Sequence, residues 1–279
     1  MSNMVRQKHN LLNRLEKELP EGVLVDAPWF KKHGYSRQLL NHYVKTGWLQ
    51  QPAHGLYRRP RGSLSWQQLV VSLQSFLDYP LAVGGRTALE LQGYAHYLSH
   101  NDREVHLYGS KLSGSWIKNL KLGVQFRFHT DKRLFPKHPI APELERLKSP
   151  NAKPPLNATL TSVSLGQWDW KLFVSTPERA LLELLDELPG RETFHQVDML
   201  MQGLTNLSPR RLQSLLADCK SVKVKRLFFF FADRHAHAWL KPLKKQKFDL
   251  GTGKRLLVKG GRLDPTYQIT VPEDLNGLP

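Results

Sequence analysis

A row of polar side chains on one expected helix has the types and spacing that contact nucleic-acid bases. Ser36 is a good N-cap, and the segment RQLLNHYVKTG that follows predicts a helix ended by Gly47. One face of this helix is apolar, and the other carries Arg37, Gln38, Asn41, His42 and Lys45. Arginine pairs with guanine, asparagine or glutamine pairs with adenine, and lysine holds phosphates. We expect Ser36 and this polar face to contact DNA, although a face that merely meets solvent has a similar composition.

The elements around this helix are the ones that would position it in a groove of the duplex. An amphipathic helix is expected over residues 5–19, and a short helix capped by Asp26 ends at Gly34. After the polar-faced helix, a turn over residues 52–55 joins two short strands. This order predicts a winged helix-turn-helix with its core at about residues 5–60. Three arginines of the wing are expected to hold phosphates: Arg58, Arg59 and Arg61.

The charge of the chain favours a polyanionic partner. It has 41 Lys+Arg and 24 Asp+Glu, a formal net charge of +17. The excess lies in three blocks, with net charges of +7 for residues 1–62, +7 for 111–155 and +12 for 209–262. Separate basic blocks suit a nucleic acid, because each neutralised phosphate releases condensed counterions. A high isoelectric point by itself says nothing about fold, so the charge supports this interpretation without deciding it.

Composition and length exclude several classes of protein. The 279 residues suggest two domains, and 40% hydrophobic residues suffice for real cores, which excludes a disordered basic protein. The longest unbroken apolar run, Leu227–Ala232, is far shorter than a membrane span of about 20 residues. The N-terminal residues lack the pattern of a signal peptide, so a cytoplasmic location and no membrane partner are expected. The single cysteine, Cys219, permits no internal disulfide and fits a reducing compartment.

The remainder of the chain predicts a second, mainly helical domain. Strands are expected at residues 104–108 and 124–130, and six prolines within 134–160 favour a linker or an extended basic loop. Helices are expected after Thr176 and Ser208, and the ambiguous stretch from Ser221 favours a helix. Glycine-rich turns from residue 248 onward favour a terminal meander of three short strands.

The fold class that follows is α+β. It consists of an N-terminal winged helix-turn-helix and a mixed, mainly helical C-terminal domain closed by a small antiparallel sheet. The boundaries that we expect are 1–95 for the DNA-binding domain and 96–279 for the second domain.

No motif predicts catalysis, a metal or a cofactor. Ser115–Lys118 spells SxxK without the accompanying elements of penicillin-recognising enzymes, and Gly251–Lys254 is too short for a phosphate-binding loop. The histidines, among them His129, His138, His235 and His237, have no HExxH spacing and no cysteine partners. Cys219 lies in a leucine-rich segment and is expected to be buried. The protein is therefore not expected to be an enzyme.

Several longer motifs carry a family resemblance. They are GGRTALELQGYA, STPERALLELL, LLADCKSVKVKRLFFFFADR and DLGTGKRLLVKGGRLDPTYQITVP, which together with the N-terminal pattern extend over nearly the whole chain. The sequence resembles the AbiEi antitoxins, the repressor half of bacterial abortive-infection type IV toxin-antitoxin systems. The resemblance implies a repressor that binds inverted repeats in its own promoter and an antitoxin that counteracts a nucleotidyltransferase-like toxin, with no stable complex between the two. One winged helix fills one half-site, so a monomer that binds DNA cooperatively would suffice.

A second polyanion surface is expected in the C-terminal part, although basic runs are as often solvated faces. Its candidates share a basic side chain and an exposed-looking position: Lys223, Lys225, Arg226, Lys254, Arg255 and Arg262. Two other functions stay open at this point. One is an RNA-binding or nucleic-acid-modifying enzyme that uses the basic surface, and the other is a protein–protein adaptor whose winged helix has lost DNA binding.

Overall fold

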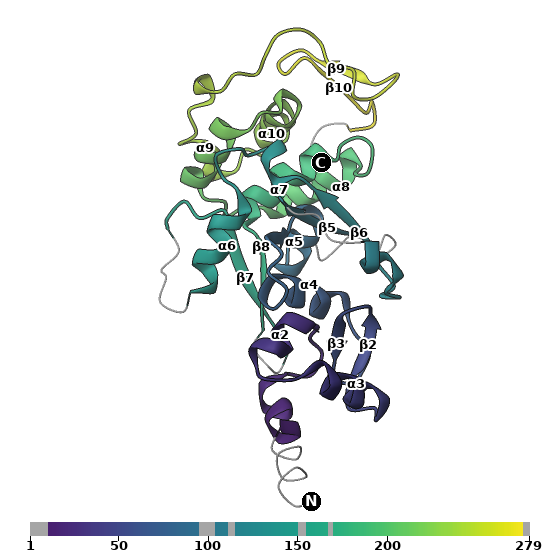
Figure 1. The fold of residues 1–279 in the computed structure, drawn as a ribbon. Helices are drawn as coiled ribbons and strands as arrows, with labels where there is room; N and C mark the ends of the chain where they lie inside the picture. Colours follow the sequence, from purple (N-terminus) through teal and green to yellow (C-terminus); the bar gives the residue numbers. More distant parts are fainter. Residues whose placement is uncertain (1–10, 95–103, 111–114, 150–154, 167–169, 276–279) are drawn as a thin grey trace, which may run out of the picture. The chain divides into compact units, whose positions relative to one another are not determined.

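The chain forms two compact units in the computed structural model, which describes residues 11–94, 104–110, 115–149, 155–166 and 170–275 (Figure 1). The first unit comprises Met1–Tyr79, Ser113–Gln125 and Leu165–Leu172, and the second comprises Pro80–Leu112, Phe126–Ser164 and Phe173–Pro279. No helix within the described ranges is long and apolar enough to cross a membrane. Residues 5–10 of the expected first helix lie outside the described residues.

Three helical segments near the start of the first unit form as their local signals predict. Residues 11–18 are helical, and α2 (Ala27–Lys32) begins where the Asp26 carboxylate accepts a hydrogen bond from Trp29 N. α3 (Arg37–Lys45) begins where Ser36 Oγ accepts a hydrogen bond from Leu39 N over 3.2 Å. Gly34, with φ +82°, makes the turn between α2 and α3 in a conformation that favours glycine.

A small antiparallel sheet is formed by one strand before α2 and two strands after α3. Its strands are β1 (Val25–Asp26), β2 (Gln50–Ala53) and β3 (Leu56–Arg58), in the order β1-β3-β2. The β2–β3 hairpin is confirmed, whereas the pairing of β1 with β3 was not predicted. α4 (Trp66–Ser75) begins with a capping box in which Ser65 and Gln68 bond each other's backbone N–H groups.

One hydrophobic core holds the helices and the small sheet together. Its residues come from the first helix, from α2 and α3, from the small sheet and from the loops that join them. They are Leu15, Leu19, Val23, Val25, Phe30, Tyr35, Leu40, Tyr43, Leu49 and Tyr57. Phe30 lies at its centre, because its ring makes edge contacts with Tyr35 and Tyr57, with ring centroids 5.5 Å apart in both pairs. The core therefore fixes the orientation of α3 relative to the β2–β3 hairpin.

The second unit contains a five-stranded mixed sheet, of which only the strands expected at residues 104–108 and 124–130 were predicted. Its strands are β4 (Leu81–Val83), β5 (Glu104–Gly109), β6 (Gln125–His129), β7 (Leu160–Leu165) and β8 (Trp170–Ser175), in the order β6-β5-β4-β8-β7. β4 pairs antiparallel with β5 and parallel with β8. The α+β class is confirmed, but the second domain is not closed by a small terminal sheet alone.

The proline-rich stretch is not the linker or extended loop that we expected. A short turn of 3-10 helix at Asp131–Arg133 precedes it, and the stretch itself contains α6 (Ile140–Lys148). Pro142 is tolerated because it lies in the first turn of α6, where backbone N–H groups have no helical partner. The Glu143 carboxylate accepts from Thr159 N and Leu160 N, and these bonds fasten α6 to the start of β7. Pro150 and Pro154 lie outside the described residues.

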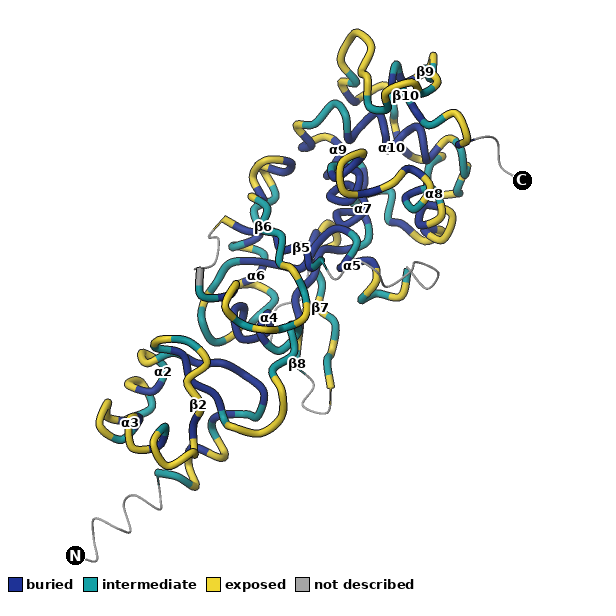
Figure 2. Tube along the Cα trace, turned by 90° about the vertical axis from the view of Figure 1, so that its right-hand side faces the viewer, coloured by how far each residue is buried: buried dark blue, intermediate teal, exposed yellow. Residues whose placement is uncertain are grey.

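Helices cover the rest of the second unit. They are α5 (Gly85–Leu91), α7 (Pro177–Asp186), α8 (Phe194–Gly203), α9 (Pro209–Asp218) and α10 (Val222–His235). The helix expected after Ser221 is confirmed, and Figure 2 shows α7 and α10 as mostly buried. Shorter 3-10 turns lie at Ala238–Leu240 and Lys245–Lys247, and another lies at Ser115–Asn119 in the first unit.

The C-terminal segment contains two paired strands rather than a three-stranded meander. β9 (Arg262–Asp264) and β10 (Ile269–Val271) pair antiparallel, and the third expected strand is reduced to a single bridge between Arg255 and Ile269.

Candidate nucleic-acid interface

The polar face of α3 is exposed along its whole length. Arg37, Gln38, Asn41, His42 and Lys45 are all exposed, whereas Leu40 and Tyr43 on the opposite face are 3% and 4% exposed. Figure 2 shows the same alternation along this helix. Side chains on such a face are free to meet the edges of bases in a groove wide enough for a helix.

Two buried tyrosines, Tyr35 and Tyr43, hold α3 in place. The Tyr35 hydroxyl donates to Leu11 O over 3.2 Å and so joins the first helix to the turn before α3. Burial raises the pKa of Tyr35 to about 12, and the nearby Glu18 carboxylate acts in the same direction. Burial also raises the pKa of Tyr43. Both tyrosines are therefore neutral near pH 7 and serve as packing residues rather than as contacts for an anion.

Arg58 does not lie where a phosphate-binding residue should. It is 4% exposed, and its guanidinium donates to Arg59 O over 3.0 Å, to Arg61 O over 2.8 Å and to Gly62 O. Burial lowers the pKa of Arg58, but an arginine remains charged in proteins. The guanidinium donates to three carbonyl groups, so the prediction that Arg58 holds a phosphate does not agree with its buried position.

The other two wing arginines form ion pairs within the first unit. Arg59 lies 3.5 Å from Glu16 and 3.2 Å from Glu21, and only 12% of its side chain is exposed. Arg61 lies 2.9 Å from Glu21 but is 68% exposed. These pairs lower the net positive charge that the wing presents, so the exposed face of α3 is the stronger candidate for contact with an anionic partner.

Other exposed residues near the ends of α2 and α3 were not predicted as contacts from the sequence. Lys31 and Lys32 occupy the last turn of α2 and are exposed, and their adjacency in the sequence was a signal for a phosphate contact. Trp48 is 46% exposed just after α3. It lines a pocket of about 290 Å³ together with Leu12, Leu15, Glu16, Thr46, Gly47, Arg59, Pro60 and Arg61.

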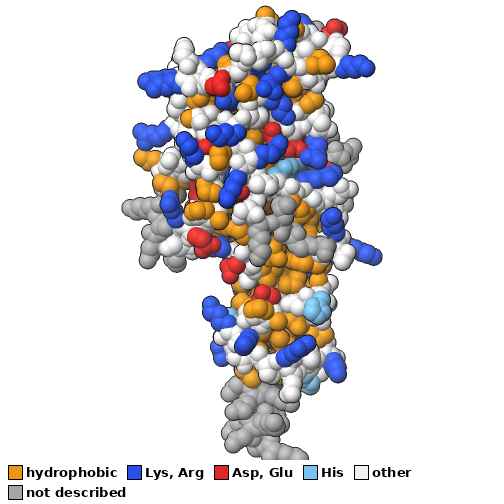
Figure 3. Space-filling model, turned by 45° about the horizontal axis from the view of Figure 1, so that its top comes forward, with side chains coloured by type: hydrophobic (Ala, Val, Ile, Leu, Met, Phe, Trp, Pro, Cys, Tyr) orange, Lys and Arg blue, Asp and Glu red, His pale blue; other side chains and the backbone are white. Residues whose placement is uncertain are grey.

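The six basic candidates of the C-terminal part differ in exposure, and Lys223 is partly buried. Lys254, Arg255 and Arg262 are exposed. Lys225 and Arg226 are only 7% and 2% exposed, so the expectation that they form a surface is wrong. Lys and Arg side chains are spread among acidic and uncharged ones on the face drawn in Figure 3.

Arg226 and Lys223 have structural partners instead. Arg226 donates to the backbone carbonyls of Leu250, Gly253 and Gln268 over 2.6 to 3.2 Å. Lys223 Nζ donates to Asp186 O and Leu188 O over 2.6 and 2.7 Å. Lys223 therefore fastens α10 to the end of α7, and the buried Arg226 fastens it to the C-terminal loops, because a buried cation needs acceptors that replace water.

The Gly251–Lys254 motif and Cys219 show no feature of a catalytic site. Gly251 and Gly253 both have positive φ values, which fits the turn that we expected rather than a phosphate-binding loop. Cys219 is buried, as expected, and burial raises the pKa of its thiol. A thiol in that state is a poor nucleophile, because the reactive form is the thiolate.

Comparisons with known proteins cover almost the whole chain. Residues 8–100 match the family model described as "Transcriptional regulator, AbiEi antitoxin N-terminal domain". Residues 102–272 match the model described as "Transcriptional regulator, AbiEi antitoxin, Type IV TA system". Among curated proteins, none matches the sequence. A crystal structure of the RV2827C protein from Mycobacterium tuberculosis resembles this fold with a TM-score of 0.57 and 18% identity, over 94% of this chain and 89% of that chain.

Proposed function

The chain belongs to the AbiEi antitoxin family of transcriptional regulators of type IV toxin-antitoxin systems, and on that premise we propose that it binds promoter DNA through α3. The observation that carries this proposal is the asymmetry of α3. One face is packed into the core, while the other exposes side chains that can form hydrogen bonds with bases. The described residues of the first unit thus present a helix suited to the major groove.

The arrangement of α2, α3 and the β2–β3 hairpin supports a winged helix-turn-helix. In this motif the first helix crosses the DNA backbone, the second lies in the major groove and the hairpin contacts the flanking duplex. α2 and α3 are joined by a tight turn at Gly34, and the hairpin follows α3 after four residues. We assign the role of recognition helix to α3.

Within α3, position along the helix divides the contacts into two kinds. The N-terminal residues of a recognition helix reach base edges, which assigns this role to Arg37, Gln38 and Asn41. Lys45 lies in the last turn and is assigned to a phosphate, as are Lys31 and Lys32 of α2. His42 remains a candidate contact beside them. Phosphate contacts fix the register of the protein on the duplex, and the base contacts select the sequence.

The proposed target is a pair of inverted repeats in the promoter of the chain's own operon. One recognition helix reads one half-site, so two chains must occupy an inverted repeat. Cooperative binding of monomers fulfils this requirement without a dimer in solution. The chain would thereby repress its own transcription.

The second part of the proposal concerns the antitoxin activity. The partner would be a nucleotidyltransferase-like toxin encoded beside the repressor, which the chain counteracts without forming a stable complex. The larger second unit would carry this activity, because the proposed DNA contacts all lie in the first. The exposed residues Lys254, Arg255 and Arg262 are candidates for a polyanion surface in that unit.

A gel-shift titration tests the DNA-binding proposal. The full chain is titrated against the DNA upstream of its own gene and against a shuffled duplex of equal length, at about 50 and 200 mM salt. We expect promoter-specific shifts that persist at the higher salt, with successive bands as half-sites fill. Equal binding to both duplexes that disappears at the higher salt would overturn the proposal.

A further inference from the structure

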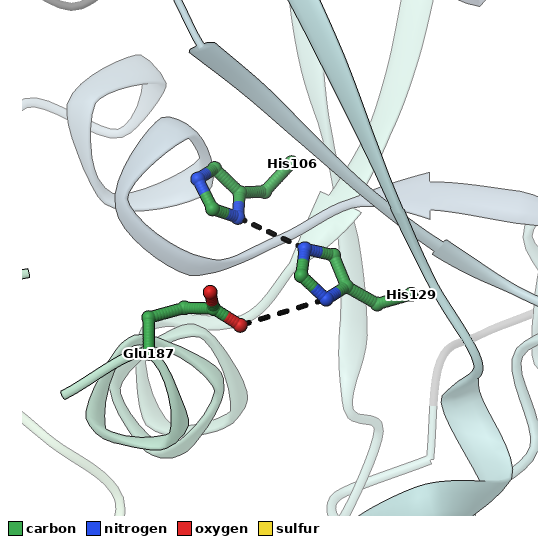
Figure 4. Close-up of side chains that lie close together, drawn as sticks. All are labelled: His106, His129 and Glu187. Atoms are coloured by element: carbon green, nitrogen blue, oxygen red, sulfur yellow. Dashed lines mark hydrogen bonds and ion pairs between the residues drawn. The ribbon is translucent and has the colours of Figure 1, made fainter. Parts of the chain in front are cut away.

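Two histidines and a glutamate from three separate elements meet inside the second unit. His106 lies on β5, His129 is the last residue of β6, and Glu187 is the C-cap residue of α7 (Figure 4). His106 Nδ1 lies 3.0 Å from His129 Nε2, and His129 Nδ1 lies 3.5 Å from Glu187 Oε1. One ligand atom from each residue falls within 4.8 Å of the other two. No HExxH spacing predicted this cluster, because its members are brought together only by folding.

The cluster is almost closed to solvent. The side chains of His106, His129 and Glu187 are 5%, 10% and 6% exposed. Tyr108 stacks on His129 with ring centroids 4.5 Å apart, and its buried hydroxyl has no hydrogen-bond partner among the described residues. Buried polar atoms are normally satisfied. An ion that brings a water molecule into this space would supply partners that the side chains lack.

The donor set matches a transition metal of the zinc class. Imidazole nitrogen and carboxylate oxygen are standard ligands of Zn²⁺, whereas Mg²⁺ and Ca²⁺ prefer oxygen alone. Two ligands on one tetrahedral zinc ion lie about 3.3 Å apart, given bond lengths of about 2.0 to 2.1 Å. The two facing nitrogens of His106 and His129 are already close to that separation. A metal held by these two nitrogens would replace the hydrogen that the rings can share, and Glu187, which faces the other nitrogen of His129, would turn its carboxylate to reach the same ion.

Neighbouring groups provide the outer contacts that metal ligands usually have. Arg191 donates to the second oxygen of Glu187 over 2.9 Å, which leaves the first oxygen directed at His129. The carboxylate of Glu104 lies 3.9 Å from His106 Nε2 and is held in place by Arg127. Glu104 and Glu187 are thus the two carboxylates beside the cluster, and each is also paired with an arginine.

We propose that His106, His129 and Glu187 bind one divalent transition metal ion with Zn²⁺-type chemistry. The ion joins two strands of the five-stranded sheet to the end of α7, so it stabilises the fold of the second unit. This site is independent of the proposed DNA contacts, because none of its residues belongs to the first unit.

Metal binding by the full chain tests the proposal. The purified chain is treated with a chelator, dialysed and titrated with Zn²⁺ by calorimetry and with Co²⁺ by visible absorption. We expect one ion per chain, the intense absorption of four-coordinate Co²⁺ and a higher melting temperature with Zn²⁺. A chain that takes up neither ion and melts at the same temperature with and without Zn²⁺ would overturn the proposal.

Two ligand variants and one control locate the ion. His129→Ala and the milder Glu187→Gln should each weaken Zn²⁺ binding by about tenfold or more. His195→Ala changes an exposed histidine of the same unit that lies 3.4 Å from Asp274, and it should bind Zn²⁺ as the wild type does. Unchanged affinity in Glu187→Gln, together with loss in His195→Ala, would assign the ion to the surface and contradict the proposed site.

Discussion

Arg58 Nη2 donates to the backbone carbonyl of Arg61 over 2.8 Å. The Arg58 side chain therefore holds the segment that carries the other two wing arginines, Arg59 and Arg61. Arg58→Ala should destabilise the protein by about 1 to 3 kcal/mol, because it removes a buried guanidinium that donates to three backbone carbonyl groups. Arg58→Lys should recover only part of this loss, since an ammonium group cannot reproduce the geometry of the guanidinium fork.

Urea denaturation measures the free energy of unfolding of these variants. Arg61→Ala is the matched control, because its side chain is exposed and its backbone carbonyl remains in place, so its loss should stay below about 0.5 kcal/mol. If Arg58→Ala were as stable as Arg61→Ala, the structural role of Arg58 would be refuted.

The ion pairs of the wing predict which cations contribute to salt-dependent DNA binding. Lys45→Ala should lower the slope of log affinity against log salt by about 0.9, because each phosphate contact releases counterions. Arg59→Ala should change the slope less, since Glu16 and Glu21 already pair with this arginine. Fluorescence anisotropy at several salt concentrations provides the slopes, and a larger change for Arg59→Ala than for Lys45→Ala would contradict the assignment.

A buried ion pair in the second unit should be sensitive to the loss of one partner. Arg179 and Glu183 are both fully buried, and Arg179 Nε donates to Glu183 Oε1 over 2.8 Å. Burial raises the pKa of Glu183, a shift that Arg179 opposes. Arg179→Met should cost about 3 to 5 kcal/mol, because it leaves a buried carboxylate without its cation.

The double variant Arg179→Met/Glu183→Leu should recover much of that loss, because an apolar pair leaves no charge unpaired. Thermal and urea denaturation of the two variants and of the exposed control Arg262→Ala provide the comparison. The prediction fails if Arg179→Met is as stable as the control.

Alkaline pH should weaken the fold through Tyr35. Burial raises its folded pKa to about 12, whereas an unfolded tyrosine titrates near pH 10. The contribution of its neutral form to stability is therefore complete below about pH 10 and is lost as the pH rises toward 12. Tyr35→Phe should show a shallower fall in urea midpoint across this range, despite losing the bond to Leu11 O. An identical pH dependence in both proteins would contradict the buried, neutral state of Tyr35.

Local signals were sufficient to predict the helices before the hairpin. Asp26 and Ser36 are cap residues, and Gly34 and Gly47 end their helices, so each boundary depends on a few neighbouring side chains. The polar face of α3 was read from helical spacing in the same way. The exposure of the wing arginines could not be predicted in this way. It depends on carbonyl and carboxylate groups that only the folded chain brings near these side chains.

The five-stranded sheet depends on contacts that are distant in the sequence. β4 is only Leu81–Val83, and its partner in β8 is Val174. A three-residue apolar segment gives no periodicity from which to predict a strand. The prolines near α6 misled the prediction because Pro142 lies in the first turn, where a helix tolerates it. The cluster of His106, His129 and Glu187 was not predicted for the same reason. The pairing of strands that are distant in the sequence brings its residues together.

The most direct test of the central claim is the specificity of a double variant of the recognition helix. Arg37→Ala/Asn41→Ala and the control His195→Ala, an exposed position on α8 of the second unit, are titrated against the promoter and the shuffled duplex. The account predicts that the double variant loses about 1 to 3 kcal/mol of promoter affinity for each base contact, while its affinity for the shuffled duplex changes little. A correctly folded double variant that binds the promoter as tightly as the wild type, or loses affinity equally for both duplexes, would contradict sequence recognition by α3.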